Sequence, residues 1–304
     1  MRSSCRISGS AVETGVFGIA TSLNNERVDS IVSDSENECI PFLKWVGGKS
    51  RFVREIGRFV PRNFNNYYEP FLGSGVVFCA YGKEKRAFLS DVNEELINAF
   101  VQVRDNCGKL VRCLAEFENT EEEYYRIRSE VFTSKIRRAA RFIFLNKTSY
   151  NGVFRVNRRG YFNVPYGHNP GAPFYHAEKL RRLSKVLRAN VTLTSIDFEE
   201  ALSDVKKGDF VFIDPPYTVS HGNNGFIEYN KKLFSWEDQK RLADCTERLA
   251  RKGAYFVLTN AKHPSILALY RNTGNYFELT RQNGITSVID RRGTTTEYLF
   301  TNYR

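Results

Sequence analysis

The chain of 304 residues is long enough for one large domain, or two modest ones, with a proper hydrophobic core. Hydrophobic residues make up 41% and aromatic residues 14%, which excludes a disordered chain. The formal net charge of +11 and the pI of about 9.3 favour a polyanionic partner.

No apolar run approaches the roughly 18 residues of a transmembrane helix, and no basic-then-apolar leader opens the chain. We therefore expect a cytoplasmic protein with no membrane partner. The six cysteines form no Cys-x-x-Cys pair, which argues against a zinc site or a disulfide framework. We expect most of them to be reduced, Cys79 to lie in the core, and no metal to be bound.

Residues 1–39 are rich in serine and show little periodicity, which is typical of a flexible N-terminal extension. From residue 40 onward, strand and helix signals alternate. Buried strands are predicted at 67–71, 86–91, 191–196, 210–213 and 254–259, and helices at 76–81, 93–103 and 235–252. The last helix has Ser235 as its predicted N-cap and Gly253 at its end. Strands separated by helices predict an α/β fold with a doubly wound, mostly parallel sheet.

The stretch 108–175 interrupts this rhythm with charged helical segments and then a section rich in Gly, Asn and Pro, which is typical of a β-hairpin. We predict an inserted, mainly helical domain here, with 40–107 and 176–304 forming the main domain. Residues 131–177 contain eight Lys or Arg, ten aromatic residues and no Asp or Glu. Basic side chains neutralise phosphates, and aromatic or amide side chains on a hairpin can enter a groove. This pattern favours nucleic-acid contact over a merely solvated basic face.

The segment Asp214-Pro215-Pro216-Tyr217 directly follows the apolar run at 210–213. Prolines cannot donate into a sheet ladder, so the strand is expected to stop here. A carboxylate, a rigid turn and an aromatic ring then stand at the carboxyl end of a strand, where open α/β sheets bind ligands. The alternative is an ordinary proline-rich turn in which Tyr217 only packs.

A Gly-x-Gly turn, Gly73-Ser74-Gly75, follows the strand that contains Glu69. Such glycines let the backbone approach a nucleotide-like ligand closely. The dinucleotide fingerprint needs a third glycine at position 78, where Phe78 stands, so an adenosyl ligand without a pyrophosphate is favoured. Asp91 ends the next strand, about where a ribose-binding acid falls in a nucleotide-binding βαβ unit.

A second glycine-containing segment, 44–50, ends in Gly-Lys-Ser and resembles the end of a phosphate-binding P-loop. A P-loop needs glycine at position 43, and Leu43 stands there, so ATP binding through this segment is not expected. Trp45 either packs in the core or offers its ring face to a cation.

Together these residues resemble the Dam-type DNA adenine-N6 methyltransferases over about residues 40–304. The matching motifs occur in the order of that family: Lys44-Trp45-x-Gly47-Gly48-Lys49, Glu69-Pro70-Phe71-x-Gly73-x-Gly75, Ser90-Asp91-x-Asn93, the hairpin motif that begins Tyr150-Asn151-Gly152 and ends Pro165-x-Gly167, and Asp214-Pro215-Pro216-Tyr217. The resemblance implies a class I methyltransferase fold, S-adenosyl-L-methionine as methyl donor, and transfer to adenine in double-stranded DNA. It also identifies 108–175 as the target-recognition domain.

The resemblance assigns roles by position. The catalytic motif is Asp214, Pro215, Pro216 and Tyr217. The cofactor-binding positions are Trp45, Lys49, Glu69, Phe71, Gly73, Gly75, Asp91 and Asp214. The DNA-binding positions are Lys44, Tyr150, Asn151, Val153, Arg155 and Pro165, to which we add Arg158 and Arg159 as phosphate contacts. Val153 replaces the leucine expected in the hairpin, which bears on the target sequence.

An adenine amino nitrogen is a poor nucleophile, because its lone pair is delocalised into the ring. Two acceptors aimed at its hydrogens, the Asp214 carboxylate and the Pro215 carbonyl, would direct that lone pair at the methyl group. The target base must first leave the duplex, and Tyr217 would stack on it. The 218–232 loop is expected to close over the base.

We therefore predict a monomeric adenine-N6 DNA methyltransferase, with GATC as the family's common target. Two alternatives stay open: a cytosine-N4 methyltransferase of the same fold, and a DNA-binding relative without catalysis. An RNA substrate is disfavoured, because the hairpin matches readers of duplex DNA.

Overall fold

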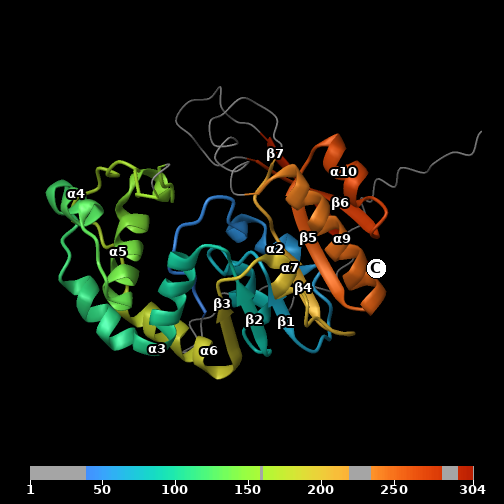
Figure 1. Ribbon diagram of the computed structural model, residues 1–304, viewed down its shortest axis with the longest axis horizontal. Coiled ribbons are helices and arrows are strands. Elements are labelled where there is room, and N and C mark those ends of the chain that lie inside the picture. Colours follow the sequence, from blue (N-terminus) through green and yellow to red (C-terminus); the bar gives the residue numbers. More distant parts are fainter. Residues whose placement is uncertain (1–38, 158–159, 219–233, 283–293, 304) are drawn as a thin grey trace, which may run out of the picture. The chain divides into compact units, whose positions relative to one another are not determined.

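The fold is built on a seven-stranded sheet (Figure 1). The computed structural model describes residues 39–157, 160–218, 234–282 and 294–303. The strand order is β3-β2-β1-β4-β5-β7-β6. The strands are β1 (Tyr67–Glu69), β2 (Ala87–Ser90), β3 (Val191–Thr194), β4 (Phe210–Ile213), β5 (Tyr255–Ala261), β6 (Asn275–Gln282) and β7 (Thr294–Thr301). All five strands predicted from the sequence are present, within a few residues of the expected bounds.

The first five strands pair in parallel, and β7 runs antiparallel to both β5 and β6. The chain leaves β1 toward β2 and β3 on one side, then returns to β4 and β5 on the other side. The strand order therefore reverses between β1 and β4, and such a switch point opens a ligand crevice at the carboxyl ends of the strands.

Strand residues alternate between two apolar cores, one on each face of the sheet. Tyr67, Phe210 and Val257 belong to one core and Tyr68, Val211 and Phe256 to the other. The first core includes residues of α3 (Glu94–Ala115) and η3 (Phe78–Gly82), and the second includes residues of α7 (Phe198–Ala201), α9 (Trp236–Lys252) and α10 (Pro264–Tyr270). Helices cover both faces, so the predicted doubly wound sheet is confirmed.

The ends of α9 match their predicted positions, because both are determined by local chemistry. The Ser235 hydroxyl accepts from the Asp238 N–H, and the Asp238 carboxylate accepts from the Ser235 N–H, which together form a capping box. At the other end, Gly253 adopts the left-handed conformation with φ of 74°.

Two strands, the full length of one helix, and several further helices, among them those at 177–190 and 264–270, were not predicted. β6 and β7 pair with each other in an antiparallel ladder, and neither was identified from the sequence. α3 continues well beyond the predicted 93–103 and reaches Ala115, with a non-helical residue at Asn106. It therefore runs from the sheet into the predicted inserted segment.

Within 108–175, α4 (Glu121–Ser129) and α5 (Lys135–Thr148) precede the one-turn helix η4 (Tyr150–Gly152), and α5 packs along α3. In the described part of the chain, the other helices are η2 (Lys49–Arg51), α2 (Val53–Gly57) and α6 (Ala177–Asn190). The expected hairpin is present as two isolated antiparallel bridges, Ser149–Tyr166 and Val156–Phe162, rather than as long strands. No helix among the described residues is both long and apolar enough to span a bilayer.

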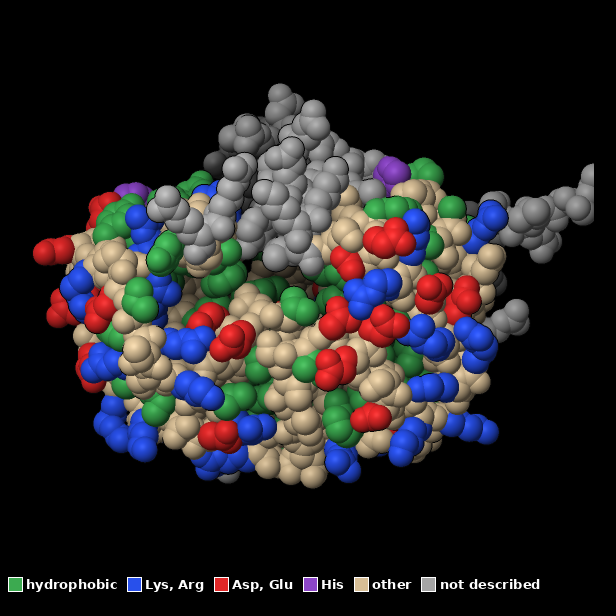
Figure 2. Space-filling view, in the orientation of Figure 1, with side chains coloured by type: hydrophobic (Ala, Val, Ile, Leu, Met, Phe, Trp, Pro, Cys, Tyr) green, Lys and Arg blue, Asp and Glu red, His purple; other side chains and the backbone are tan. Residues whose placement is uncertain are grey.

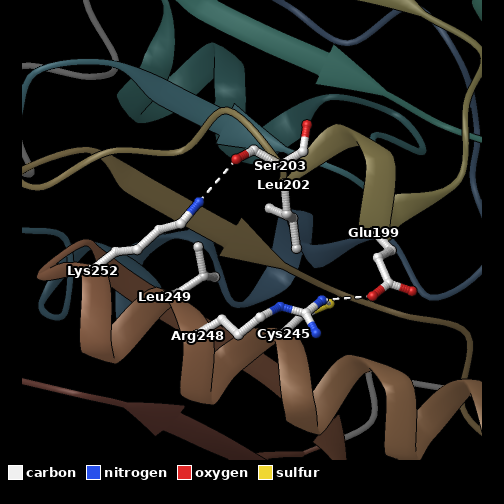
Figure 3. A pocket seen from close by; sticks show the side chains of 7 residues that line it. All are labelled: Glu199, Leu202, Ser203, Cys245, Arg248, Leu249 and Lys252. Carbon is white, nitrogen blue, oxygen red and sulfur yellow. Dashed lines mark hydrogen bonds and ion pairs between the residues drawn. The ribbon is translucent and has the colours of Figure 1, made fainter.

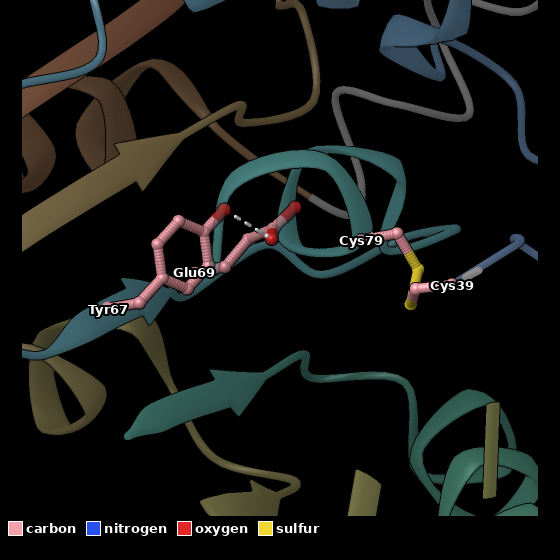
Figure 4. Close-up of a disulfide and its surroundings, with 4 residues drawn as sticks. All are labelled: Cys39, Tyr67, Glu69 and Cys79. Carbon is pink, nitrogen blue, oxygen red and sulfur yellow. Dashed lines mark hydrogen bonds between the residues drawn. A yellow bond between two sulfur atoms is a disulfide. The ribbon is translucent and has the colours of Figure 1, made fainter. Parts of the chain in front are cut away.

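The sequence argued against disulfides, but Cys39 and Cys79 form one (Figure 4). They are 40 residues apart, and only the fold brings their Cα atoms to 5.0 Å. Cys79 is buried, as predicted, in η3. Cys107, Cys113 and Cys245 are free thiols.

Candidate functional site

Three predicted site carboxylates stand at the carboxyl ends of adjacent parallel strands. Glu69 ends β1, Asp91 follows β2, and Asp214 follows β4. Because β2, β1 and β4 are neighbours in the sheet, the fold gathers these residues at one edge, at the switch point.

The glycine turn after β1 is held by Asp91. One carboxylate oxygen, Oδ2, accepts from the Gly73 N–H at 3.1 Å, and Oδ1 accepts from the Asn93 N–H at 3.0 Å. Gly73 and Gly75 have positive φ of 49° and 69°, which favours glycine at both positions. A Cβ on Gly73 would lie 2.7 Å from Trp45 Cδ1, so glycine also permits the close approach of Trp45.

Glu69 is buried, and its carboxyl group faces Tyr67, whose hydroxyl donates to Oε2 at 2.7 Å (Figure 4). Burial, helped by the nearby Asp214 and Asp91 carboxylates, raises the pKa of Glu69 to about 8, against the hydrogen bonds from the Tyr67 hydroxyl and the Phe78 backbone N–H. Loss of hydration likewise raises the pKa of Asp91 to about 6. At this edge of the sheet, Glu69 and Asp91 therefore lose their protons at a higher pH than they would in water.

Asp214 forms an ion pair with Lys49, the residue at which η2 begins. Lys49 Nζ lies 2.7 Å from Asp214 Oδ1, and the same oxygen accepts from the Thr259 hydroxyl at 2.8 Å. Lys49 is only 3% exposed and also donates to the Gly47 carbonyl at 2.9 Å. Desolvation raises the pKa of Asp214, while the Lys49 ammonium opposes this shift.

Tyr217 joins the same cluster through Glu297. The Tyr217 hydroxyl donates to Glu297 Oε2 at 2.8 Å, and Lys49 Nζ lies 3.5 Å from that oxygen. Lys49 Nζ also stands over the Tyr217 ring, 5.0 Å from its centroid. Glu297 was not predicted as a site residue, since its strand β7 was not identified either.

A cavity of about 290 Å³ opens beside this cluster. Its lining comes mostly from the segment that precedes α2: Trp45, Gly47, Gly48, Ser50, Arg51, Phe52 and Glu297. Phe71, another predicted cofactor position, lies at the end of β1, where its ring stacks on Phe198 at 5.5 Å between centroids. In the predicted catalytic motif, Pro215 is buried and Pro216 is half-buried.

Trp45 connects this site to the hairpin. Its ring stacks on Phe154, with centroids 5.9 Å apart and planes inclined by 21°, and it also packs near Phe142 of α5. Its neighbour Lys44 donates its backbone N–H to Asn146 Oδ1 at 2.9 Å, and the Asn146 side chain donates back to the Lys44 carbonyl at 2.7 Å. The predicted cofactor and DNA positions are thus in contact through 44–45.

The predicted DNA positions of the hairpin are mostly exposed. Tyr150 is 56% exposed, and its N–H donates to the Pro165 carbonyl at 2.9 Å. Asn151 adopts the left-handed conformation with φ of 54°. Arg155 is held by Asn163, whose Oδ1 accepts from the Arg155 Nε at 2.9 Å. Val153 packs against the core, and Arg158 and Arg159 lie outside the described residues.

A second cavity, of about 310 Å³, lies between α7 and α9, on the sheet face that these helices and α10 cover (Figure 3). Its charged groups already have partners. Arg248 pairs with Glu199 at 2.7 Å, and Lys252 donates to the Ser203 carbonyl at 2.8 Å. The face shown in Figure 2 carries Lys and Arg side chains dispersed among Asp and Glu.

Comparison with known proteins identifies the class. Residues 45–287 match the family model of the D12 class N6 adenine-specific DNA methyltransferases. The sheet and its strand-end site agree with the class I methyltransferase fold expected from the sequence. The chain belongs to the D12 class N6 adenine-specific DNA methyltransferases, and it is therefore an enzyme whose substrate is DNA.

Three relatives illustrate the similarity. The chain is 37% identical over 273 residues to the Type II methyltransferase M1.LlaDCHI of Lactococcus lactis subsp. cremoris, covering 86% of this chain and 95% of that protein. It is 37% identical over 246 residues to the Type II methyltransferase M.MjaIII of Methanocaldococcus jannaschii, covering 74% and 85%. It is 32% identical over 254 residues to the retron Ec67 DNA adenine methylase of Escherichia coli, covering 81% and 86%.

Proposed function

We propose that this enzyme takes its methyl group from S-adenosyl-L-methionine and transfers it to an adenine flipped out of duplex DNA, within GATC. The observation that carries the proposal is the Asp214-Pro215-Pro216-Tyr217 turn at the end of β4, beside the glycine turn at the end of β1. The end of β4 would present acceptors to an amino group. The end of β1 would present a backbone that a nucleoside can approach closely.

The residues present fit S-adenosyl-L-methionine. Asp214 and Glu297 surround Lys49, so two carboxylates face one ammonium, and the excess negative charge suits a cationic ligand. Asp91 lies where a ribose acid is expected, and Trp45, Phe71, Gly73 and Gly75 would enclose the adenosyl group. When bound, the cofactor supplies an electrophilic methyl group on a positively charged sulfur.

Asp214 and Pro215 would activate the target amino group. Lys49 and Thr259 both bind Oδ1 of Asp214, so we assign the other carboxylate oxygen to one amino hydrogen. The Pro215 carbonyl would accept the second hydrogen, with the proline rings limiting its direction. No strong base is needed, because the proton can leave after the nitrogen has become cationic, so positioning and electrostatics carry the catalysis.

The hairpin and the acid-free segment around it would hold the DNA. Arg155, oriented by Asn163, can bind O6 and N7 of a guanine, and Lys44, Tyr150, Asn151, Val153 and Pro165 surround it. Unstacking a base costs a few kcal/mol, which stacking on Tyr217 and the phosphate contacts offset. We accordingly propose that 108–175 act as the target-recognition domain and that 40–107 and 176–304 act as the catalytic domain of a monomer.

The proposal is tested by methylating plasmid DNA with the purified protein and S-adenosyl-L-methionine. Protection from an enzyme that cuts only unmethylated GATC, together with cleavage by one that cuts only methylated GATC, is the expected result. Nucleoside analysis should show N6-methyladenine, and N4-methylcytosine would reject the adenine target. A protein that binds the cofactor and DNA without turnover would instead be an inactive relative.

A further inference from the structure

Glu297 is a carboxylate that the strand pattern turns toward the site. Tyr298 and Phe300 on β7 face the core with α9 and α10, whereas Leu299 faces the opposite core. Side chains alternate along a strand, so Glu297 lies on the Leu299 face, where Lys49 also lies. With 9% of its surface exposed, the carboxylate has lost most of its water, and burial of such a group is costly unless partners replace that water.

Its partners belong to the proposed catalytic motif and to the cluster around Asp214. Oε2 accepts from the Tyr217 hydroxyl at 2.8 Å, which is a charge-assisted hydrogen bond, and lies at the longer distance of 3.5 Å from Lys49 Nζ. Lys49 already has a closer partner in Asp214 at 2.7 Å. The shorter contact of Glu297 is therefore the one to Tyr217.

This contact determines how the Tyr217 ring is held. The hydroxyl is anchored at one end by Glu297, the backbone is constrained at the other end by two prolines, and the Lys49 ammonium stands over one face of the ring at 5.0 Å. A base that stacks on Tyr217 would then use the opposite face of the ring.

We propose that Glu297 is a positioning residue for methyl transfer: by accepting the Tyr217 hydroxyl hydrogen, it holds the ring in the orientation on which the flipped adenine stacks. This inference rests on the proposed function. Glu297 acts through Tyr217 and touches neither the adenine nor the transferred methyl group.

The test compares single-turnover rates on a GATC duplex at saturating cofactor for wild type, Glu297→Ala, Glu297→Gln and Tyr217→Phe. Loss of a hydrogen bond to a charged group predicts a rate decrease of about 10- to 100-fold for Glu297→Ala, with a similar decrease for Tyr217→Phe. Glu297→Gln keeps an acceptor oxygen and should recover most of the rate. Glu278→Ala removes an exposed carboxylate from the neighbouring strand, where it pairs with Lys262, and serves as the matched control.

A double variant separates the Tyr217 route from the Lys49 route. If Glu297 acts through the hydroxyl, Tyr217→Phe combined with Glu297→Ala should be no slower at saturating cofactor than either single variant. Additive losses, or a Glu297→Gln variant as slow as Glu297→Ala, would overturn the inference. Wild-type protein that fails to methylate the duplex would reject the proposed function instead, whereas active wild type with equally active Glu297→Ala would reject this inference alone.

Discussion

At the scale of single residues, the carboxylates of the candidate site differ in the groups that bind them. Asp214 is stabilised by the Lys49 ammonium and the Thr259 hydroxyl, Asp91 by two backbone N–H groups, and Glu69 by the Tyr67 hydroxyl and the Phe78 N–H. An ammonium favours the ionised form most strongly, because it adds a full opposite charge to the hydrogen bond. Substitutions at Asp214 and Glu69 should therefore have different consequences.

Replacing Asp214 should abolish methyl transfer without unfolding the protein. In Asp214→Ala, the amino group loses its charged acceptor, which predicts a decrease in kcat of at least about 100-fold. Lys49 keeps Glu297 and the Gly47 carbonyl as partners, so the fold should survive with a lower melting temperature. Turnover is measured by radiolabelled methyl transfer and folding by circular dichroism. A folded variant with turnover near wild type would contradict the assignment.

Glu69 should make stability depend on pH. Its folded pKa of about 8 lies above its ordinary value of 4.5, so the folded state binds its proton more tightly than the unfolded state does. The free energy of unfolding should therefore fall as pH rises from about 4.5 to about 8. Asp91, with a folded pKa of about 6, adds a fall of the same sign at lower pH.

Urea unfolding at pH 6.5 and 8.5 isolates the Glu69 effect. Between these values, wild type should lose roughly 2 kcal/mol more stability than Glu69→Gln, which cannot ionise but can still accept from Tyr67. Equal pH dependence of the two proteins would show that Glu69 does not titrate in this range.

At the scale of elements, the sequence predicted what local chemistry determines. The capping box at Ser235, the left-handed Gly253 and the strand that ends at Asp214 each depend on neighbours within a few residues. β6 (NYFELTRQ) and β7 (TTTEYLFT) were missed because neither contains a continuous apolar run like that of β4 (FVFI). Glu297 was missed because its partner Tyr217 lies 80 residues earlier. The Cys39–Cys79 disulfide likewise depends on a contact between positions 40 residues apart.

Substitutions in the hairpin should change the DNA sequence specificity of methyl transfer, and not only its rate. Arg155→Ala removes a planar guanidinium held by Asn163, which predicts a loss of about 1–3 kcal/mol of discrimination at one guanine. Transfer rates on duplexes that vary one base at a time would locate that guanine. A uniform loss over all duplexes would identify Arg155 as a phosphate contact instead.

At the scale of the whole molecule, the distribution of charged residues says more about DNA binding than the net charge of +11 does. On the face shown in Figure 2, basic and acidic side chains are intermixed. Several arginines of the described residues form close ion pairs with acidic side chains. Arg126 of α4, for example, pairs with both Glu123 and Glu130 at 2.7 Å. Residues 131–177 contain no acid, but Arg137 and Arg138 pair with Glu116, Glu94 and Glu95 outside this segment. The better candidates for phosphate contacts are therefore Arg158 and Arg159 of the predicted hairpin.

The proposed phosphate contacts of Arg158 and Arg159 predict how DNA binding depends on salt concentration. Each phosphate neutralised by a basic side chain adds about 0.9 to the slope of log affinity against log salt concentration. Replacing both Arg158 and Arg159 by Ala should therefore make the slope shallower by about 2. Arg126→Ala is the matched control, because its charge is already compensated within α4, and its slope should equal that of wild type. Fluorescence anisotropy with a labelled duplex between about 50 and 200 mM salt measures all three proteins. An unchanged slope for the double variant would place the phosphate contacts elsewhere on the chain.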